Sequence, residues 1–379
     1  VKARIGWGDT ECAANYKSHP PPTLLATGRP HPFDDEWMRT RSLGYYAARV
    51  KVPTYISQTW QDNQTLVTGA TEVYRQLTVP KRLALSPGGH GAIYVQRAFQ
   101  DDLVRWMDRW LKGSRNGIEK EPPVMVYWEI GASGTPPAPS WVTRHDAWPV
   151  KEMAARTFYL TGDGKLVATA PPDDASRPAT RSYTFPSGVE LVGDNAQFAL
   201  PPDPTGSLEW TSEPLGEDLT ILGSADLTFF VSSENVDTDF VIALHDIYPN
   251  GDVQYLQRSF LRASMRRIDE ARSRPDHLQR TYDRTEPLIP GQVYEIRVML
   301  PPLGAVLRAG HRLGVALLAP SAVPQPDWGL LPLDLPGRNT VHFSSRYPSR
   351  VSIPAASGLP VPGPEPRCGT LAYQPCRRA

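Results

Sequence analysis

Hydrophobic and polar positions follow two different patterns along this chain of 379 residues. In its first third, two short segments that are typical of strands, Thr54–Gln58 and Arg82–Ser86, flank the segment Val67–Leu77, in which apolar residues recur near helical spacing. A strand, a helix and a second strand in this order form a β-α-β unit, whose two strands run parallel in one sheet. The pattern therefore predicts an α/β sheet between Val50 and Gly91.

An amphipathic helix is predicted next, with charged residues opposite its apolar face and Gly113 at its end. Its apolar positions are Phe99, Leu103, Trp106, Met107, Trp110 and Leu111. Ser114–Pro123 is a polar linker that ends in proline, and we place a domain boundary there. Residues 1–122 would then form an α/β domain, with its strands and final helix within 49–113, and residues 123–379 a second domain.

From Val124 onward the apolar runs are short and rich in β-branched and aromatic residues, which is typical of strands separated by turns. The predicted strands are Val124–Trp128, Thr157–Leu160, Leu227–Ser232, Phe240–Ile247, Val253–Arg262, Val293–Leu300, Arg312–Leu318 and Val341–Phe343. About eight strands with long connections favour a jelly-roll β-sandwich. The charged segment Arg266–Asp283 is either a short helix or a loop.

Composition and charge exclude several classes of partner. Lys+Arg and Asp+Glu both number 40, so no basic stripe indicates binding to nucleic acid or to an anionic membrane. No apolar run approaches the ~18 residues of a membrane span. No cluster of His, Cys and carboxylates has metal-ligand spacing, and His245 and His311 are interpreted as structural residues of strands. We therefore expect no metal and no organic cofactor.

The three cysteines leave the cellular compartment open. Cys368 and Cys376 lie in a tail rich in proline and glycine, where they could close a small disulfide loop, and Cys12 has no obvious partner. A disulfide there would favour an oxidising compartment, whereas three free thiols would fit the cytosol. We expect a secreted protein, with a cytoplasmic one as the alternative.

Two polar side chains follow the two predicted parallel strands, Asp62 after the first and His90 after the second. Reactive groups of open α/β sheets collect at the carboxyl ends of the strands. A serine nucleophile needs an imidazole to take its proton, and the imidazole needs a carboxylate to fix its tautomer. An Asp followed by a His is also the chain order of these residues in α/β-hydrolases. The plainer alternative is a turn-capping Asp and a solvated His.

An ordered set of segments resembles the hydrolase family of cocaine esterase and the X-Pro dipeptidyl-peptidases. In the first domain these are His31–Trp37 with Arg39 and Arg41-Ser42, Trp60-Gln61-Asp62, Gly88–Gly91 and Leu111-Lys112-Gly113. Pro290-Gly291-Gln292 and Leu307–Leu313 resemble the non-catalytic C-terminal β domain of that family. The resemblance implies an α/β-hydrolase domain followed by a β-sandwich, with Asp62 and His90 as members of a catalytic triad.

The resemblance also implies a role for the first residues. Residues 1–48 would be the remnant of a mostly helical cap over the active site. Phe33, Trp37 and Trp60 are then candidate residues for binding a small ester or peptide substrate, although such aromatic residues more often pack the cap.

The chain departs from the family at the nucleophile, because no Gly-x-Ser-x-Gly occurs in the sequence. We therefore interpret it as the C-terminal part of a serine hydrolase whose serine lies outside these residues, and expect the chain alone to be inactive. The rival hypothesis is a non-catalytic jelly-roll module that binds a carbohydrate or a protein partner. Four tryptophans could form its stacking platform: Trp141, Trp148, Trp210 and Trp328.

Overall fold

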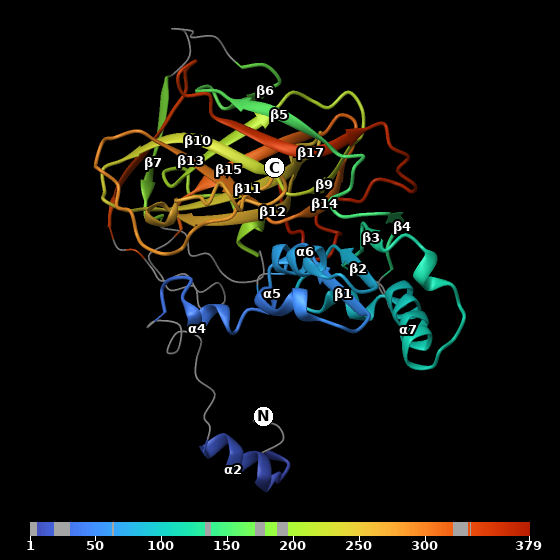
Figure 1. Ribbon diagram of the computed structural model, residues 1–379. Coiled ribbons are helices and arrows are strands. Elements are labelled where there is room, and N and C mark those ends of the chain that lie inside the picture. The colour runs from blue at the N-terminus through green and yellow to red at the C-terminus, as the bar shows by residue number, and fades with distance from the viewer. Residues whose placement is uncertain are drawn as a thin grey trace.

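The computed structural model describes residues 6–18, 31–62, 64–132, 138–170, 179–187, 196–320, 333 and 335–379. These residues form a four-stranded sheet and a fourteen-stranded network of strands, preceded by short helices (Figure 1). The helices are α2 (Thr10–Ser18), α4 (Glu36–Arg39) and α5 (Leu43–Tyr46), followed by a single 3-10 turn, Ala47–Arg49. The carboxylate of Asp35 caps α4 by accepting a hydrogen bond from the Met38 amide at 2.9 Å.

The four-stranded sheet contains the predicted β-α-β unit. Its elements are β1 (Thr54–Thr59), α6 (Val67–Gln76), β2 (Lys81–Ser86), α7 (Arg97–Leu111), β3 (Val124–Trp128) and β4 (Trp141–His145). Strands β1 and β2 pair in parallel from Thr54↔Lys81 to Thr59↔Ser86, as the sequence predicts. Strand β3 continues the sheet in parallel beside β2, and β4 closes it antiparallel to β3.

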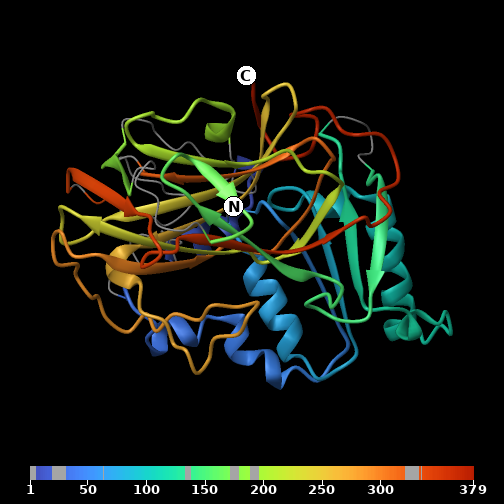
Figure 2. The ribbon, with the colours of Figure 1, turned by 90° about the horizontal axis from the view of Figure 1, so that it is seen from above.

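Helices α6 and α7 cover opposite faces of this sheet (Figure 2). Successive residues of β2 point to opposite faces, so Leu83 and Leu85 pack with Tyr74 of α6 while Ala84 packs with Phe99 of α7. A strand buried on both faces is continuously apolar, which explains the run at β2 and the run Val124–Trp128.

The second set of strands forms a β-sandwich. Its strands are β5 (Ala154–Leu160), β6 (Lys165–Val167), β7 (Thr180–Phe185), β8 (Ser207–Ser212), β9 (Leu219–Gly223), β10 (Asp226–Ser233), β11 (Asp239–Ile247), β12 (Val253–Arg262), β13 (Tyr294–Met299), β14 (Leu303–Leu307), β15 (Arg312–Leu318), β16 (Gly337–His342), β17 (Arg350–Ser357) and β18 (Cys376–Arg377). Their main core is a cluster of buried apolar residues, in which Phe229 of β10 meets Phe240 of β11 edge to face at 5.1 Å. The fold is thus an α/β sheet followed by a β-sandwich.

One part of the predicted organisation is wrong. We expected Val124–Trp128 to begin the β-sandwich, but as β3 it lies in the α/β sheet, with Val124 beside Leu83. The linker before it leads the chain from α7 back to the same sheet, where a strand buried on both faces has its place. The change from one sheet to the other comes between β4 and β5.

A buried ion pair fixes α7 on the sheet. The guanidinium of Arg82 on β2 donates two hydrogen bonds of 2.7 Å to the carboxylate of Asp102 on α7, and the Tyr55 hydroxyl donates a third at 2.9 Å. The side chains of Arg82 and Asp102 are 1% and 4% exposed. A charge this deeply buried is tolerated only while its partner is present.

Arg82→Met should lower the free energy of unfolding by ~3–5 kcal/mol, because it keeps the volume of the side chain and leaves the Asp102 carboxylate without its main partner. Urea denaturation measures this. The control is Arg97→Met on α7, whose exposed pair with Asp101 is worth at most ~1 kcal/mol. Equal losses in the two variants would show that the buried pair does not hold α7 in place.

A cluster of charged residues lies where β3 meets the β-sandwich. The Arg308 guanidinium donates to the Glu129 carboxylate at 2.5 Å, and both side chains are buried. Beside them, His311 is within 2.8 Å of Asp246 through one ring nitrogen and within 2.8 Å of Glu365 through the other. Burial raises the pKa of Glu129 to about 7, despite the opposing charge of Arg308.

Stability should therefore fall as the pH rises. Burial favours the neutral form of Glu129, so the folded state holds a proton that the unfolded chain releases above its ordinary pKa of 4.5, and this stabilisation is lost as the pH passes about 7. Burial lowers the pKa of His311, but its hydrogen bonds to Asp246 and Glu365 outweigh burial and raise the pKa. A raised histidine pKa in the folded state also makes stability fall as the pH rises.

We predict that Glu129→Gln removes on the order of 2 kcal/mol from the difference in unfolding free energy between pH 5 and pH 8. Urea denaturation at the two pH values measures it. Glu152→Gln, at an exposed glutamate, is the control. An unchanged pH dependence in Glu129→Gln would contradict the assignment.

Candidate active site

Asp62 lies just beyond the carboxyl end of β1, and the turn that follows holds its carboxylate. One carboxylate oxygen accepts hydrogen bonds from the backbone amides of Gln64 and Thr65 at 2.8 and 3.1 Å. The other accepts the Thr65 hydroxyl at 2.8 Å. Bonds from an Asp to amides two and three residues later form a compact local turn. The side chain is 1% exposed and is therefore fixed before any partner binds.

His90 lies in the loop Pro87–Gly91 after β2. Gly88 and Gly91 have φ values of 131° and 75°, which favour glycine and explain why the loop is rich in it. The loop is bound to the end of β1, because the Thr59 hydroxyl donates to the Gly89 carbonyl at 2.8 Å. The Gln61 side chain also accepts the Gly88 amide at 2.9 Å.

The two predicted residues meet at one edge of the sheet. Nδ1 of His90 lies 3.1 Å from Oδ2 of Asp62, within the range that a triad pair requires. The His90 side chain is 57% exposed, so the imidazole remains accessible to an incoming group. A buried carboxylate on Nδ1 favours the tautomer that leaves Nε2 free to accept a proton. The arrangement can therefore act as a general base.

A cavity of about 550 Å³ adjoins Asp62. Four parts of the chain line it: residues between Gln61 and Thr68 after β1, residues of β12 between Tyr255 and Phe260, residues between His277 and Tyr282 in the charged segment of the β-sandwich, and Val298, Met299 and Pro301 at the end of β13. That segment forms loops and isolated bridges rather than a helix, and its Arg274 forms an ion pair with Glu72 on α6. The β-sandwich thus contributes directly to the space beside Asp62.

The three aromatic residues predicted to bind substrate lie elsewhere. Trp60 is 1% exposed and packs in the core against Trp148 at 6.2 Å, with Gly304 of the β-sandwich close to its ring. Its assignment to the substrate pocket is wrong, because this position faces the junction of the two sheets. Trp37 stacks on His31 at 4.4 Å, and neither it nor Phe33 lines the cavity.

The proposed tryptophan platform is also absent among the described residues. Trp210 is 1% exposed and donates its indole N–H to the Thr161 carbonyl. Trp141 stacks on Trp128 and Trp148 on Trp60, so both belong to the junction between the sheets. Trp328 lies outside the described residues.

Within the described ranges, one group of three side chains has metal-ligand geometry: Asp252, Cys368 and Cys376. Its two cysteines are joined in a disulfide, which removes their thiolates as ligands. No helix in the described part of the chain is long and apolar enough to cross a membrane.

Comparison with known families identifies the chain. A family model described as X-Pro dipeptidyl-peptidase (S15 family) matches residues 3–92, and one described as the X-Pro dipeptidyl-peptidase C-terminal non-catalytic domain matches residues 116–352. The chain belongs to the X-Pro dipeptidyl-peptidase family. The second model covers most of the β-sandwich and also includes β3 and β4.

Curated relatives and solved structures agree with this family. A serine esterase candidate of Mycobacterium bovis is 28% identical over 268 residues, and cocaine esterase of Rhodococcus sp. is 23% identical over 365 residues. These alignments cover 67% and 86% of this chain, but only 40% and 60% of the relatives. A CocE/NonD family hydrolase from Staphylococcus aureus has a similar fold, with a TM-score of 0.70 and 16% identity over 88% of this chain and 59% of that one.

The structure brings the predicted Asp62 and His90 together, whereas the residues that hold them were not predicted. Thr65 carried a readable signal, since an Asp followed three residues later by Thr is a local turn pattern. Thr59 and Gln61 carried none, because their partners lie about thirty residues away in the other loop.

We predict that His90 carries its proton on Nδ1 when neutral, and that Asp62→Asn abolishes this preference because the amide no longer favours that tautomer. Nitrogen-15 NMR of the histidine side chains measures the tautomer directly. Asp35→Asn is the matched control, since Asp35 pairs with His31 at 2.5 Å and does not contact His90. Identical His90 signals with and without Asp62→Asn would contradict the prediction.

Proposed function

We propose that this chain is the C-terminal part of a serine hydrolase that cleaves a small ester or amide through an acyl-enzyme. The contact between His90 Nδ1 and Asp62 Oδ2 at the ends of neighbouring parallel strands carries the proposal. Two relatives support the proposal, a serine esterase candidate and cocaine esterase. A buried carboxylate bound to an exposed imidazole has no evident use in a purely structural module.

In the proposed reaction, His90 takes the proton of a serine hydroxyl as that oxygen attacks the substrate carbonyl carbon. The proton then passes to the leaving alcohol or amine as the acyl-enzyme forms. A water molecule then attacks the acyl carbon while His90 takes its proton, and His90 gives that proton to the serine oxygen as the acyl–serine bond breaks and the carboxylic acid is released. Asp62 holds the imidazole in orientation and stabilises its positive charge, and remains ionised throughout.

The serine would come from a segment outside the printed sequence, which contains no Gly-x-Ser-x-Gly. The open side of β1 is a suitable place for that segment, because β2 is its one strand partner among the described residues. An apolar groove of about 530 Å³ lies between β1 and α7, lined by Tyr55, Trp106 and Met107 among others. Free strand edges are usually protected by charged residues or prolines, and β1 itself has neither.

Two finer features of the proposal come from the residues around the pair. Relatives that hydrolyse α-amino acid esters would need acidic residues to bind the substrate amine, and Asn63-Gln64-Thr65 follow Asp62 here. This disfavours an α-amino acid ester as substrate. The disulfide Cys368–Cys376 supports secretion, because disulfides persist in oxidising compartments.

A fluorophosphonate probe tests the proposal. The chain of residues 1–379 should show no labelled serine, whereas the protein extended to include the preceding coding sequence should be labelled. His90→Ala in the extended protein should slow labelling by ~10⁴-fold or more, because triad groups act as a unit. His31→Ala, at another histidine paired with an Asp, is the control. Labelling of a serine within residues 1–379, or equal rates in both variants, would overturn the proposal.

A further inference from the structure

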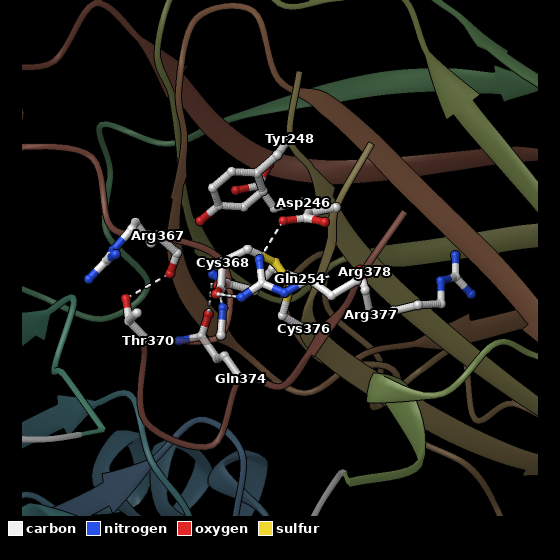
Figure 3. The surroundings of a disulfide bond; sticks show 12 residues. Asp246, Tyr248, Gln254, Arg367, Cys368, Thr370, Gln374, Cys376, Arg377 and Arg378 are labelled. Carbon is white, nitrogen blue, oxygen red and sulfur yellow. Dashed lines mark hydrogen bonds and ion pairs between the residues drawn. A yellow bond between two sulfur atoms is a disulfide. The ribbon is translucent and has the colours of Figure 1, made fainter. Parts of the chain in front are cut away.

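The last residues of the chain form a loop closed by a disulfide. Cys368 and Cys376 form a disulfide, which the sequence alone did not decide. Cys12 is a free, half-buried thiol. The loop is anchored to the β-sandwich, because Cys376 of β18 pairs with Gln254 of β12 and the Gly369 amide donates to the Gln254 side chain at 3.0 Å. Figure 3 shows Gln254, Cys368 and Cys376 around the disulfide. The disulfide and β18 therefore fix both ends of the loop.

The same loop is also bound to the α/β sheet. The Ala132 amide donates to the Thr370 carbonyl at 2.7 Å, and the Ala372 amide donates to the Ile130 carbonyl at 2.8 Å. Ala372 packs against the apolar cluster that contains Ile93, three residues after His90. The loop thus bridges the β-sandwich and the part of the α/β sheet nearest to the His90 loop.

Tyr373 lies within this loop and packs on the backbone beside His90. A side-chain carbon placed on Gly89 would lie 2.3, 2.5 and 2.9 Å from three ring carbons of Tyr373. The aromatic ring therefore fills the space that a side chain at residue 89 would occupy. The backbone of Tyr373 has a φ of 58°, a conformation that few residues other than glycine adopt, and the contacts on both sides of the loop maintain it.

The His90 loop is consequently held from two directions. On one side, Thr59 and Gln61 at the end of β1 bind Gly89 and Gly88 by hydrogen bonds. The ring of Tyr373 packs against Gly89 as well. Three glycines among the five loop residues allow many backbone conformations, so contacts from outside must select the one in which His90 reaches Asp62.

We propose that Tyr373 is a positioning residue for His90, and that the disulfide-closed loop 368–376 holds Tyr373 in place. A general base must be held within about 0.5 Å of its working position to be effective. A catalytic role for this positioning rests on the proposed function. The positioning itself is a property of this chain and can be measured without any nucleophile.

The test records His90 in the 379-residue chain by nitrogen-15 NMR, with hydrogen exchange of residues 88–92 as a second measurement. Tyr373→Ala should shift the His90 tautomer toward the spectrum of Asp62→Asn and speed loop exchange by ~10-fold or more. Tyr373→Phe retains the ring and should match the wild type. The double variant Cys368→Ser/Cys376→Ser should change His90 in the same direction as Tyr373→Ala.

Gly89→Ala tests the contact itself. Alone it should disturb His90, because its methyl group overlaps the Tyr373 ring, whereas in the Tyr373→Ala background it should add little further change. A wild-type His90 spectrum in Tyr373→Ala, or additive effects of Gly89→Ala and Tyr373→Ala, would overturn the proposal. If Tyr373 does not position His90, the predicted fluorophosphonate labelling of the extended protein still holds. If that labelling is not observed, the positioning of His90 by Tyr373 still holds.

Discussion

The parallel register of β1 and β2 is the constraint on which the site depends. It places Thr59 opposite Ser86, so the two strands end at the same edge of the sheet and their following loops lie side by side. Asp62 and His90 can then meet at 3.1 Å. A shift of one residue in this register would turn every side chain of β1 to the opposite face and separate the pair.

The site is held by parts of the chain far apart in sequence. Gln61 shows this most clearly, because its amide N–H donates to the Leu256 carbonyl of β12 at 2.9 Å while its oxygen accepts the Gly88 amide of the His90 loop. One side chain thus links β1, the His90 loop and the β-sandwich. Gln257 adds a second link by donating to the Trp60 carbonyl at 2.7 Å. The β-sandwich and the C-terminal loop therefore support the geometry of a site whose Asp and His both lie on the α/β sheet.

The sequence predicted the features that depend on local patterns. The apolar run at β2, a helical repeat at α7, and an Asp and a His after successive predicted strands were all readable, and β1 was predicted from a short mixed segment around Tyr55 and Ile56. Long-range packing was not, which is why Trp60 was placed in a pocket although it lies in the core at the junction of the sheets. Strands with mixed composition, such as β7 and β8, escaped notice because their pairing partners come from distant parts of the chain. The jelly-roll connectivity of the β-sandwich stays a prediction.

The central claim is that Asp62 and His90 act as one unit on a serine. The most direct measurement is the acylation rate of the extended, nucleophile-bearing protein with Asp62→Asn, His90→Ala and both substitutions together. If Asp62 acts only through His90, the double variant should be no slower than His90→Ala alone, within about threefold. Multiplied losses in the double variant, or a normal rate in His90→Ala, would contradict the account.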